Sequence, residues 1–231
     1  IMIADVHSLL DERKTPKNLV DFRSDYYCKV LTFILQLLGA DMTCIRFVRG
    51  SEFQYTGEYN MDVWDLTSRT TIAAAKKAGS EVVKQSKDPL LGSVIYPLMQ
   101  VVDENHIGQC AFNSQIDIEL GGVDQRKIFC FSHDNGGAIS YFMNPIISLA
   151  KSGKMSASDV NGKISFTDSD TEIQLKIKKA FCCDGDPDCG LMKLIKCVFF
   201  SLDDTNVSLT MDDGPIVHYS TYEKFESDFV K

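Results

Sequence analysis

The chain has 231 residues, a formal net charge of −8 and a sequence pI near 5.0. Its composition, with 44% hydrophobic and 24% charged residues, excludes disordered, collagen-like and low-complexity proteins. The acidic charge excludes a protein that binds nucleic acid over its whole surface, because such binding needs clustered lysine and arginine. The length allows one large domain, or one domain and part of a second.

Neither a membrane anchor nor a signal peptide is visible. The longest apolar stretch, residues 30–38, contains Thr32 and Gln36 and falls well short of the ~20 residues that span a bilayer. The eight cysteines are scattered through a chain too large to depend on disulfides. We therefore expect a cytoplasmic protein with reduced thiols. The apolar run at Ile1 predicts that the sequence begins inside a fold, with a segment upstream missing.

Predicted strands and helices alternate along the first half. Residues 1–6 form a short apolar run typical of a parallel strand that meets a loop. Helical spacing of apolar residues predicts a helix from residue 19 to residue 38, ended by Gly39, and residues 45–48 predict a second strand. Helical patterns follow over 61–78 and 90–102. The alternation predicts an α/β fold with a mainly parallel sheet and right-handed crossovers.

The amino-acid composition changes after Asn144-Pro145. Residues up to Asp159 are rich in Ser, Gly, Lys and Asp and predict an exposed loop. Ser169-Asp170-Thr171-Glu172 resembles a helix N-terminus with a capping box. The expected buried face of this helix is Ile173, Ile177 and Ala180. The tail is predicted to be helical, and we place the domain boundary between residues 150 and 151.

The loop at residues 153–158 is the first of three candidate functional motifs. It offers the ammonium group of Lys154 and several hydroxyl groups to a polyphosphate. The alternative interpretation is a solvated linker.

The second motif is the Gly-Gly-Val-Asp-Gln-Arg-Lys run at residues 121–127. Its two glycines allow the backbone to approach a ligand closely, and Asp124 and Gln125 can hydrogen-bond ribose hydroxyls or an amino-acid head group. The alternative is a tight turn before a charged surface helix.

The third motif places Tyr96, Gln100 and Asp103 on one face of the helix predicted over 90–102. Burying three polar side chains unpaired would cost ~1–3 kcal/mol each, so they either face water or line a polar pocket. The spacing leaves both interpretations open.

In order and spacing, these motifs resemble those of the tyrosyl-tRNA synthetases of eukaryotes and archaea, which are class I aminoacyl-tRNA synthetases. The resemblance covers nearly the whole chain, and further segments carry it: residues 4–7, 50–54, 76–85, 88–91, 143–145 and 179–182. It implies a Rossmann-type catalytic domain with a parallel sheet over 1–150, lacking its first strand and first signature. For 151–231 it implies a KMSKS-type loop and the start of an α-helical anticodon-binding domain.

The resemblance also implies an activity. Members of this family activate tyrosine with ATP, forming tyrosyl-adenylate and pyrophosphate, and then transfer the tyrosyl group to tRNA(Tyr) in translation. They work as homodimers, and Mg²⁺ accompanies the ATP. The expected partners are therefore tyrosine, ATP, tRNA(Tyr) and a second copy of the chain.

Site residues are carried over position by position from the same resemblance. Asp103 is expected to meet the phenolic hydroxyl of tyrosine, while Tyr96, Gln100 and Gln125 hold the amino-acid head group. Four further residues are expected to line the tyrosine pocket: Ala4, His7, Phe53 and Gln54. The residues expected to bind ATP are Gly121, Gly122, Asp124, Lys154 and Met155. The loop at residues 153–158 resembles the family's mobile loop, and it is expected to contribute the catalytic residues Lys154, Ser156 and Ser158. No metal-binding residue is expected.

The sequence departs from the family pattern in two segments, and two alternatives to the tyrosyl enzyme stay open. Residues 104–116 form a longer segment than the family usually has, and residues 132–141 a shorter one. The first alternative is a non-catalytic synthetase-like module, one half of a tandem or paired assembly that binds tRNA or acts as a scaffold. The second is a tryptophanyl-tRNA synthetase, which shares the Lys-Met-Ser-Ala-Ser loop. Asp103 and the run at 121–127 favour tyrosine.

Overall fold

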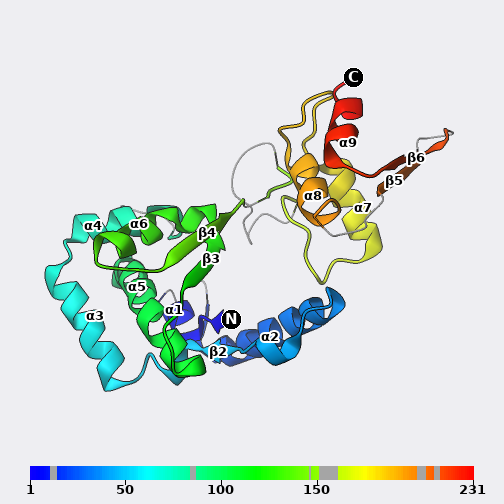
Figure 1. The fold of residues 1–231 in the computed structure, drawn as a ribbon. Coiled ribbons are helices and arrows are strands. Elements are labelled where there is room, and N and C mark those ends of the chain that lie inside the picture. Colours follow the sequence, from blue (N-terminus) through cyan, green and yellow to red (C-terminus); the bar gives the residue numbers. More distant parts are fainter. Residues whose placement is uncertain (11–14, 84–86, 146, 151–160, 202–206, 211–213) are drawn as a thin grey trace. The chain divides into compact units, whose positions relative to one another are not determined.

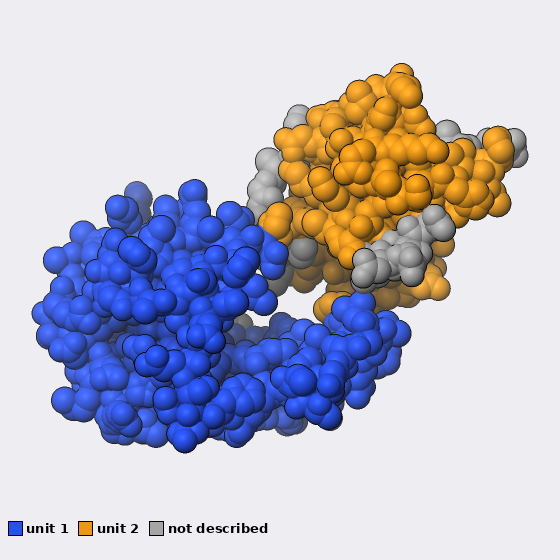
Figure 2. Space-filling model, viewed as in Figure 1, with its two compact units in different colours: residues 1–144 blue, residues 145–231 orange. Residues whose placement is uncertain are grey.

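A computed structural model describes residues 1–10, 15–83, 87–145, 147–150, 161–201, 207–210 and 214–231. The chain divides into two compact units, Ile1–Asn144 and Pro145–Lys231, which Figure 2 shows in two colours. No helix among the described residues is long and apolar enough to cross a membrane.

The first unit alternates strands with helices, as predicted (Figure 1). Its elements are β1 (Met2–Ile3), α1 (Asp5–Leu9), α2 (Val20–Leu37), β2 (Val48–Arg49), α3 (Gly57–Arg69), α4 (Ile72–Ala78), α5 (Leu91–Phe112), β3 (Ile118–Gly122), α6 (Arg126–Asp134) and β4 (Ser140–Asn144). Five short 3₁₀ helices connect them: η1 (Lys17–Leu19), η2 (Met42–Cys44), η3 (Gly50–Glu52), η4 (Gly79–Glu81) and η5 (Val123–Gln125).

Both strand pairs of the first unit are parallel, which confirms that part of the prediction. Strand β1 pairs with β2, with Met2 opposite Val48. Strand β3 pairs with β4 from Ile118, opposite Ser140, to Gly122, opposite Asn144. Parallel pairs need a crossover connection, and here long helical segments separate the paired strands.

Several predicted boundaries were wrong for local reasons. The strand expected over 1–6 is only two residues long, because helix α1 begins at Asp5. The strand expected over 45–48 begins at Val48, after the 3₁₀ turn η2. The helix expected over 61–78 is two helices, because the backbone is extended at Thr70 and at Thr71, whose side chain caps α4.

Helix α5 is the centre of the first unit. It was predicted to end near residue 102, but it continues to Phe112 and ends at Asn113, whose φ of 54° is left-handed. Most of the long segment at 104–116 is therefore additional helix. The core packs between α3, α5, α6 and β2 around buried apolar side chains such as Val48, Tyr59, Leu66, Leu98, Val102 and Ile128.

The second unit comprises three helices and a hairpin among its described residues. Helices α7 (Asp170–Lys179), α8 (Gly190–Val198) and α9 (Tyr222–Phe229) accompany the antiparallel strands β5 (Val207–Thr210) and β6 (Ile216–Tyr219). Its core is formed by Cys189, Met192, Tyr219, Tyr222 and Phe225. The tail is thus helical as expected, but the hairpin was missed.

Helix α7 begins as its sequence predicted. The hydroxyl of Ser169 accepts from the backbone N–H of Glu172, whose side chain accepts in return from the backbone N–H of Ser169. The predicted buried face was wrong, because Ile177 is 40% exposed. Lys176 is buried instead, and its Nζ lies 2.6 Å from Asp168 Oδ2. The buried side of α7 therefore contains an ion pair where the sequence predicted only apolar side chains.

Candidate active site

A cavity of about 620 Å³ in the first unit is the candidate active site. It is bounded by β1, α1, α5, β3 and η5, so segments distant in sequence meet around it. Its polar lining residues are His7, Tyr96, Gln100, Asp103, Glu104, Glu119 and Gln125. Its apolar lining includes Ile1, Met2, Ala4, Val48, Ile107, Ala111, Phe112, Ile116, Ile118 and Leu120. Cavities of this size, mainly apolar with a few convergent polar groups, are typical of small-molecule sites.

Asp103 lies at the centre of a buried hydrogen-bond network. The residue is only 5% exposed, and its Oδ1 accepts from Gln54 Nε2 at 2.6 Å and from Tyr59 OH at 2.8 Å. Its Oδ2 lies 2.7 Å from Nε2 of His7. A carboxylate only accepts, so this nitrogen of His7 carries the proton. Among the described residues, these three bonds use three of the four lone pairs of the carboxylate, and the fourth is on Oδ2, the oxygen next to His7.

Helix α1 is fixed so that it presents His7 to this network. Oδ1 of Asp5 accepts from the backbone N–H of Ser51 at 3.0 Å, and its Oδ2 accepts from the hydroxyl of Ser51 at 2.5 Å. These bonds tie α1 to η3, the segment that leads into Gln54. The ring of His7 also lies edge-on to the ring of Tyr96, with centroids 4.6 Å apart. The fold therefore sets the position of His7 from two sides.

Tyr96, Gln100 and Asp103 face the cavity from successive turns of α5. Burial raises the pKa of Tyr96, and the charges of Asp103 and Asp124 raise it further, so its hydroxyl stays protonated and can donate. Oε1 of Gln125 is buried and has no hydrogen-bond partner among the described residues. This atom is an acceptor that a ligand with N–H groups would satisfy.

Two glutamates complete the polar lining, and neither of them is among the site residues predicted from the sequence. Glu104 is 6% exposed, and its Oε2 accepts from Ser132 Oγ at 2.7 Å and from Tyr141 OH at 2.8 Å. Gln100 Nε2 donates to Glu119 Oε1 at 3.4 Å. Burial, and next the charge of Glu104, raise the pKa of Glu119 to about 7. A side chain titrating near neutral pH in a cavity is a feature of functional sites.

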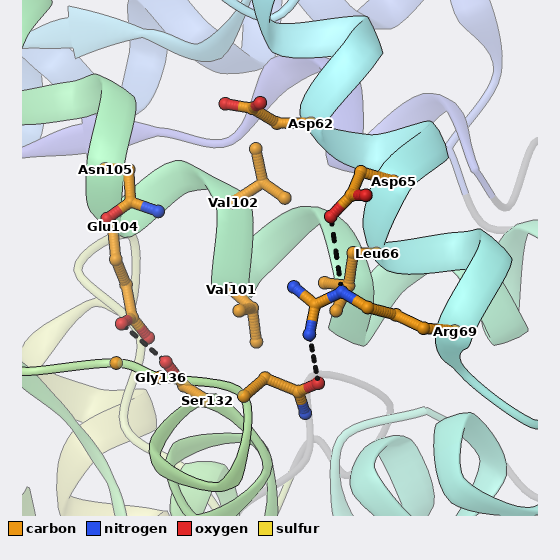
Figure 3. Close-up of a pocket in the computed structure, with 12 residues that line it drawn as sticks. Asp62, Asp65, Leu66, Arg69, Val101, Val102, Glu104, Asn105, Ser132 and Gly136 are labelled. Carbon is orange, nitrogen blue, oxygen red and sulfur yellow. Dashed lines mark hydrogen bonds and ion pairs between the residues drawn. The ribbon is translucent and has the colours of Figure 1, made fainter.

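A second, smaller cavity of about 210 Å³ lies against α3, α5 and α6, as Figure 3 shows. Nε of Arg69 donates to Asp65 Oδ2 at 3.2 Å, and its Nη1 donates to Asn135 Oδ1 at 3.1 Å. Glu104 lines both cavities and is held by Ser132 between them. Arg69 is the one cationic residue among the described residues that line this cavity, and two of its five N–H groups are thus bound to protein partners.

The structure brings most of the predicted site residues together. Those that line the large cavity are Ala4, His7, Tyr96, Gln100, Asp103, Gly121, Gly122 and Gln125. Gln54 is not part of the cavity lining, but it donates a hydrogen bond to Asp103, which is. Phe53 packs against Tyr59, with ring centroids 5.6 Å apart. Asp124 lies in η5 but is not part of the lining. The predicted loop residues Lys154, Met155, Ser156 and Ser158 lie outside the described residues.

Close packing around residue 121 explains why this position is a glycine, and the sequence did not reveal this. A Cβ at this position would lie 2.7 Å from Cζ of Phe129 and 3.1 Å from Cγ of Gln125. The absent side chain therefore lets α6 and η5 approach β3 closely. Within the described part of the chain, no group of three or more His, Cys, Asp or Glu residues is arranged to hold a metal ion.

The chain matches the family described as tRNA synthetases class I (W and Y) over residues 1–230. A relative from Encephalitozoon cuniculi, named probable tyrosine–tRNA ligase, cytoplasmic, is 38% identical over 100% of this chain and 69% of its own length. The cytoplasmic tyrosine–tRNA ligase of Xenopus laevis is also 38% identical, but the chain spans only 44% of that protein.

Solved structures give the same result. The tyrosyl-tRNA synthetase of Archaeoglobus fulgidus, complexed with L-tyrosine, is 31% identical, with a TM-score of 0.82 over 99% of this chain and 69% of that one. The expected class I synthetase fold with parallel sheets is thereby confirmed. The chain therefore belongs to the class I tRNA synthetases for tryptophan and tyrosine, and within them to the tyrosyl group of eukaryotes and archaea.

Proposed function

We propose that the protein is a tyrosine–tRNA ligase, which activates tyrosine with ATP and transfers the tyrosyl group to tRNA(Tyr). Similarity along the whole chain to proteins named tyrosine–tRNA ligase supports this function. The names of these relatives include the word cytoplasmic, in agreement with the location expected from the sequence. The cavity around Asp103 is the proposed binding site for tyrosine and ATP.

The free lone pair of Asp103 is the observation that carries the proposal. The carboxylate is held by His7, Gln54 and Tyr59, so it cannot turn to meet a different ligand. A phenolic hydroxyl entering the cavity would donate to Oδ2. A phenylalanine ring would leave that acceptor desolvated and unpaired, which is the principle by which tyrosyl-tRNA synthetases reject phenylalanine.

The ammonium group of the bound amino acid can donate to amide oxygens that line the same cavity. Oε1 of Gln125 is buried without a partner among the described residues, and Gln100 lies one helical turn from Asp103. An ammonium group brings three N–H donors, which suit these amide oxygens. We assign the head group to Tyr96, Gln100 and Gln125.

ATP is assigned to the part of the cavity near Gly121 and Gly122, with Asp124 as the partner of a ribose hydroxyl. In the reaction a carboxylate oxygen of tyrosine attacks the α-phosphorus, the new C–O–P linkage forms, and the α–β phosphoanhydride bond breaks to release pyrophosphate. The protein contributes positioning and electrostatic stabilisation, with Lys154, Met155, Ser156 and Ser158 assigned to the departing pyrophosphate. Mg²⁺ would enter with ATP, held by phosphate oxygens and water.

We further propose a homodimer that uses the exposed apolar face of α3. Met61 is 67% exposed and Trp64 61%, and both lie on the same side of the helix at a spacing of three residues. Large exposed apolar side chains, tryptophan above all, are typical of buried interface centres.

The activity is tested by tyrosine-dependent exchange of pyrophosphate into ATP, with phenylalanine and tryptophan as alternative substrates. We expect exchange with tyrosine. Asp103→Asn removes the charge and places an amide N–H against donors, so we expect a 10- to 100-fold loss of kcat/KM for tyrosine and a weaker preference over phenylalanine. Asp65→Asn, on the exposed side of α3, is the matched control.

Two results would contradict the proposal in different ways. Tyrosine binding by calorimetry without any exchange would indicate a non-catalytic synthetase-like module. Exchange with tryptophan in preference to tyrosine would indicate the tryptophanyl enzyme. Both measurements use the same purified chain.

A further inference from the structure

We propose that Glu119 is a positioning residue for Gln100, and that Glu119 is held in place by one proton shared with Glu104. This inference rests on the proposed function, because Gln100 is assigned there to the amino-acid head group. Neither glutamate belongs to the site residues expected from the family resemblance.

The contact between Gln100 and Glu119 determines how the amide of Gln100 is turned. Nε2 donates to Glu119 Oε1 at 3.4 Å, which leaves the amide oxygen of Gln100 as the atom presented to a ligand. If Glu119 moved away, the amide could turn and present its N–H₂ group instead. An ammonium group would then meet a donor where it needs an acceptor.

The hydrogen bonds of Glu104 and Glu119 indicate that the two carboxyl groups share one proton. Oε2 of Glu104 is satisfied by Ser132 and Tyr141, but Oε1 of Glu104 and Oε2 of Glu119 are buried and receive no donor from the described residues. The two carboxyl groups lie within hydrogen-bonding reach of each other. Two carboxylates cannot donate to one another, so a single shared proton satisfies both orphaned oxygens.

The surroundings favour that proton. Helix α5 contributes Asp103 as well as Glu104, strand β4 contributes Tyr141, and η5 contributes Asp124 next to the cavity. Among the described residues that line the cavity, the one basic side chain is His7, and it donates to Asp103. Burial and this negative setting raise the pKa of Glu119 to about 7, so Glu119 is protonated below neutral pH and loses the proton as the pH rises through that value.

Loss of the proton should disturb the site. Above neutral pH, two adjacent carboxylates in a poorly solvated place repel each other, and Glu119 leaves its contact with Gln100. If binding requires the protonated pair, the affinity for tyrosine falls by up to tenfold per pH unit above the pKa. Over pH 6.5 to 8 the expected loss is about tenfold.

Glu119→Gln tests the shared proton directly. Its amide N–H₂ donates to Glu104 at every pH, and its amide oxygen still accepts from Gln100. We expect tyrosine affinity, measured by calorimetry on the full chain, to fall about tenfold from pH 6.5 to pH 8 in the wild type and to change by less than about twofold in this variant. Glu119→Ala should bind weakly throughout, and the exposed control Glu223→Gln should follow the wild type.

Parallel pH profiles for the wild type and Glu119→Gln would overturn the inference, as would a wild-type affinity that rises with pH. A second measurement does not depend on tyrosine: the carboxyl carbons of the free protein, followed by NMR, should show one midpoint near pH 7 that is absent from Glu119→Gln. An ordinary midpoint near pH 4 for Glu119 would also overturn it. Absence of tyrosine binding at any pH would contradict the proposed function instead.

Discussion

Tyr59 is a buried residue, only 1% exposed, whose hydroxyl group makes three hydrogen-bond contacts. It donates to Oδ1 of Asp103 at 2.8 Å, lies 3.2 Å from the carbonyl oxygen of Met99, and accepts from Gln54 at 3.2 Å. Burial raises the pKa of Tyr59 far above the range of neutral solutions, and the charge of Asp103 raises it further. The hydroxyl is therefore a permanent donor that holds the carboxylate of Asp103 in one orientation.

Tyr59→Phe should destabilise the first unit and loosen Asp103. Removing one partner of a buried hydrogen bond leaves the other unsatisfied, so the free energy of unfolding should fall by about 1–3 kcal/mol. Urea denaturation measures this change. Tyr55→Phe makes the same substitution at a side chain that is 65% exposed and should change stability by less than about 0.5 kcal/mol. Equal effects of the two substitutions would show that Tyr59 is not the structural donor described here.

At the residue scale, the sequence was informative where the spacing within one helix set the geometry. The intervals between Tyr96, Gln100 and Asp103 predicted a shared face, and the three residues do line one cavity. The roles of Tyr59 and Glu119 could not be predicted from spacing within one helix. Tyr59 meets Asp103 across 44 residues of sequence, and Glu119 meets Gln100 across 19, so only the folded chain brings them together.

At the scale of elements, helix α7 shows how far a local signal determines a helix end. Its start depends on two reciprocal bonds between Ser169 and Glu172, both within four residues of sequence. These bonds also lower the pKa of Glu172. By contrast, the burial of Lys176 depends on its pair with Asp168, and a hydrophobic pattern cannot predict that.

Ser169→Ala should fray the first turn of α7. Loss of an N-cap side chain costs about 1 kcal/mol, so amide hydrogen exchange in residues 170–179 should become roughly fivefold faster. Ser227→Ala, at an exposed position inside α9, removes a serine without removing a cap and should leave that exchange unchanged. Unchanged protection of residues 170–179 in Ser169→Ala would contradict the role of the capping box.

Strands were the elements that the sequence described least well. The hydrogen bonds of β3 are made with β4, about 22 residues away, and those of β5 are made with β6. Strand β3 is only five residues long and ends in Gly121 and Gly122, so it has little alternating pattern of its own. Helix α5 was underestimated for a related reason: its last turns carry polar residues and Gly108, and packing of Ile107 and Ala111 stabilises them instead.

At the scale of the whole molecule, the exposed face of α3 predicts self-association. In sedimentation experiments we expect a species of twice 25.8 kDa, because Met61 and Trp64 are covered in the dimer. Trp64→Glu places a charge in that contact and should give the monomer. Leu37→Glu, at an apolar residue of α2 that is 74% exposed, is the control and should leave the dimer intact. Dissociation by Leu37→Glu alone would place the interface on α2 instead.

Trp64 has one more consequence, because it is the single tryptophan of the chain. The intrinsic fluorescence of the protein therefore reports on one position, the outer side of α3, and needs no label. An indole that is 61% exposed emits at long wavelength and is readily quenched by acrylamide. A blue shift and slower quenching as the protein concentration rises would follow assembly in real time, separately from events in the cavity around Asp103.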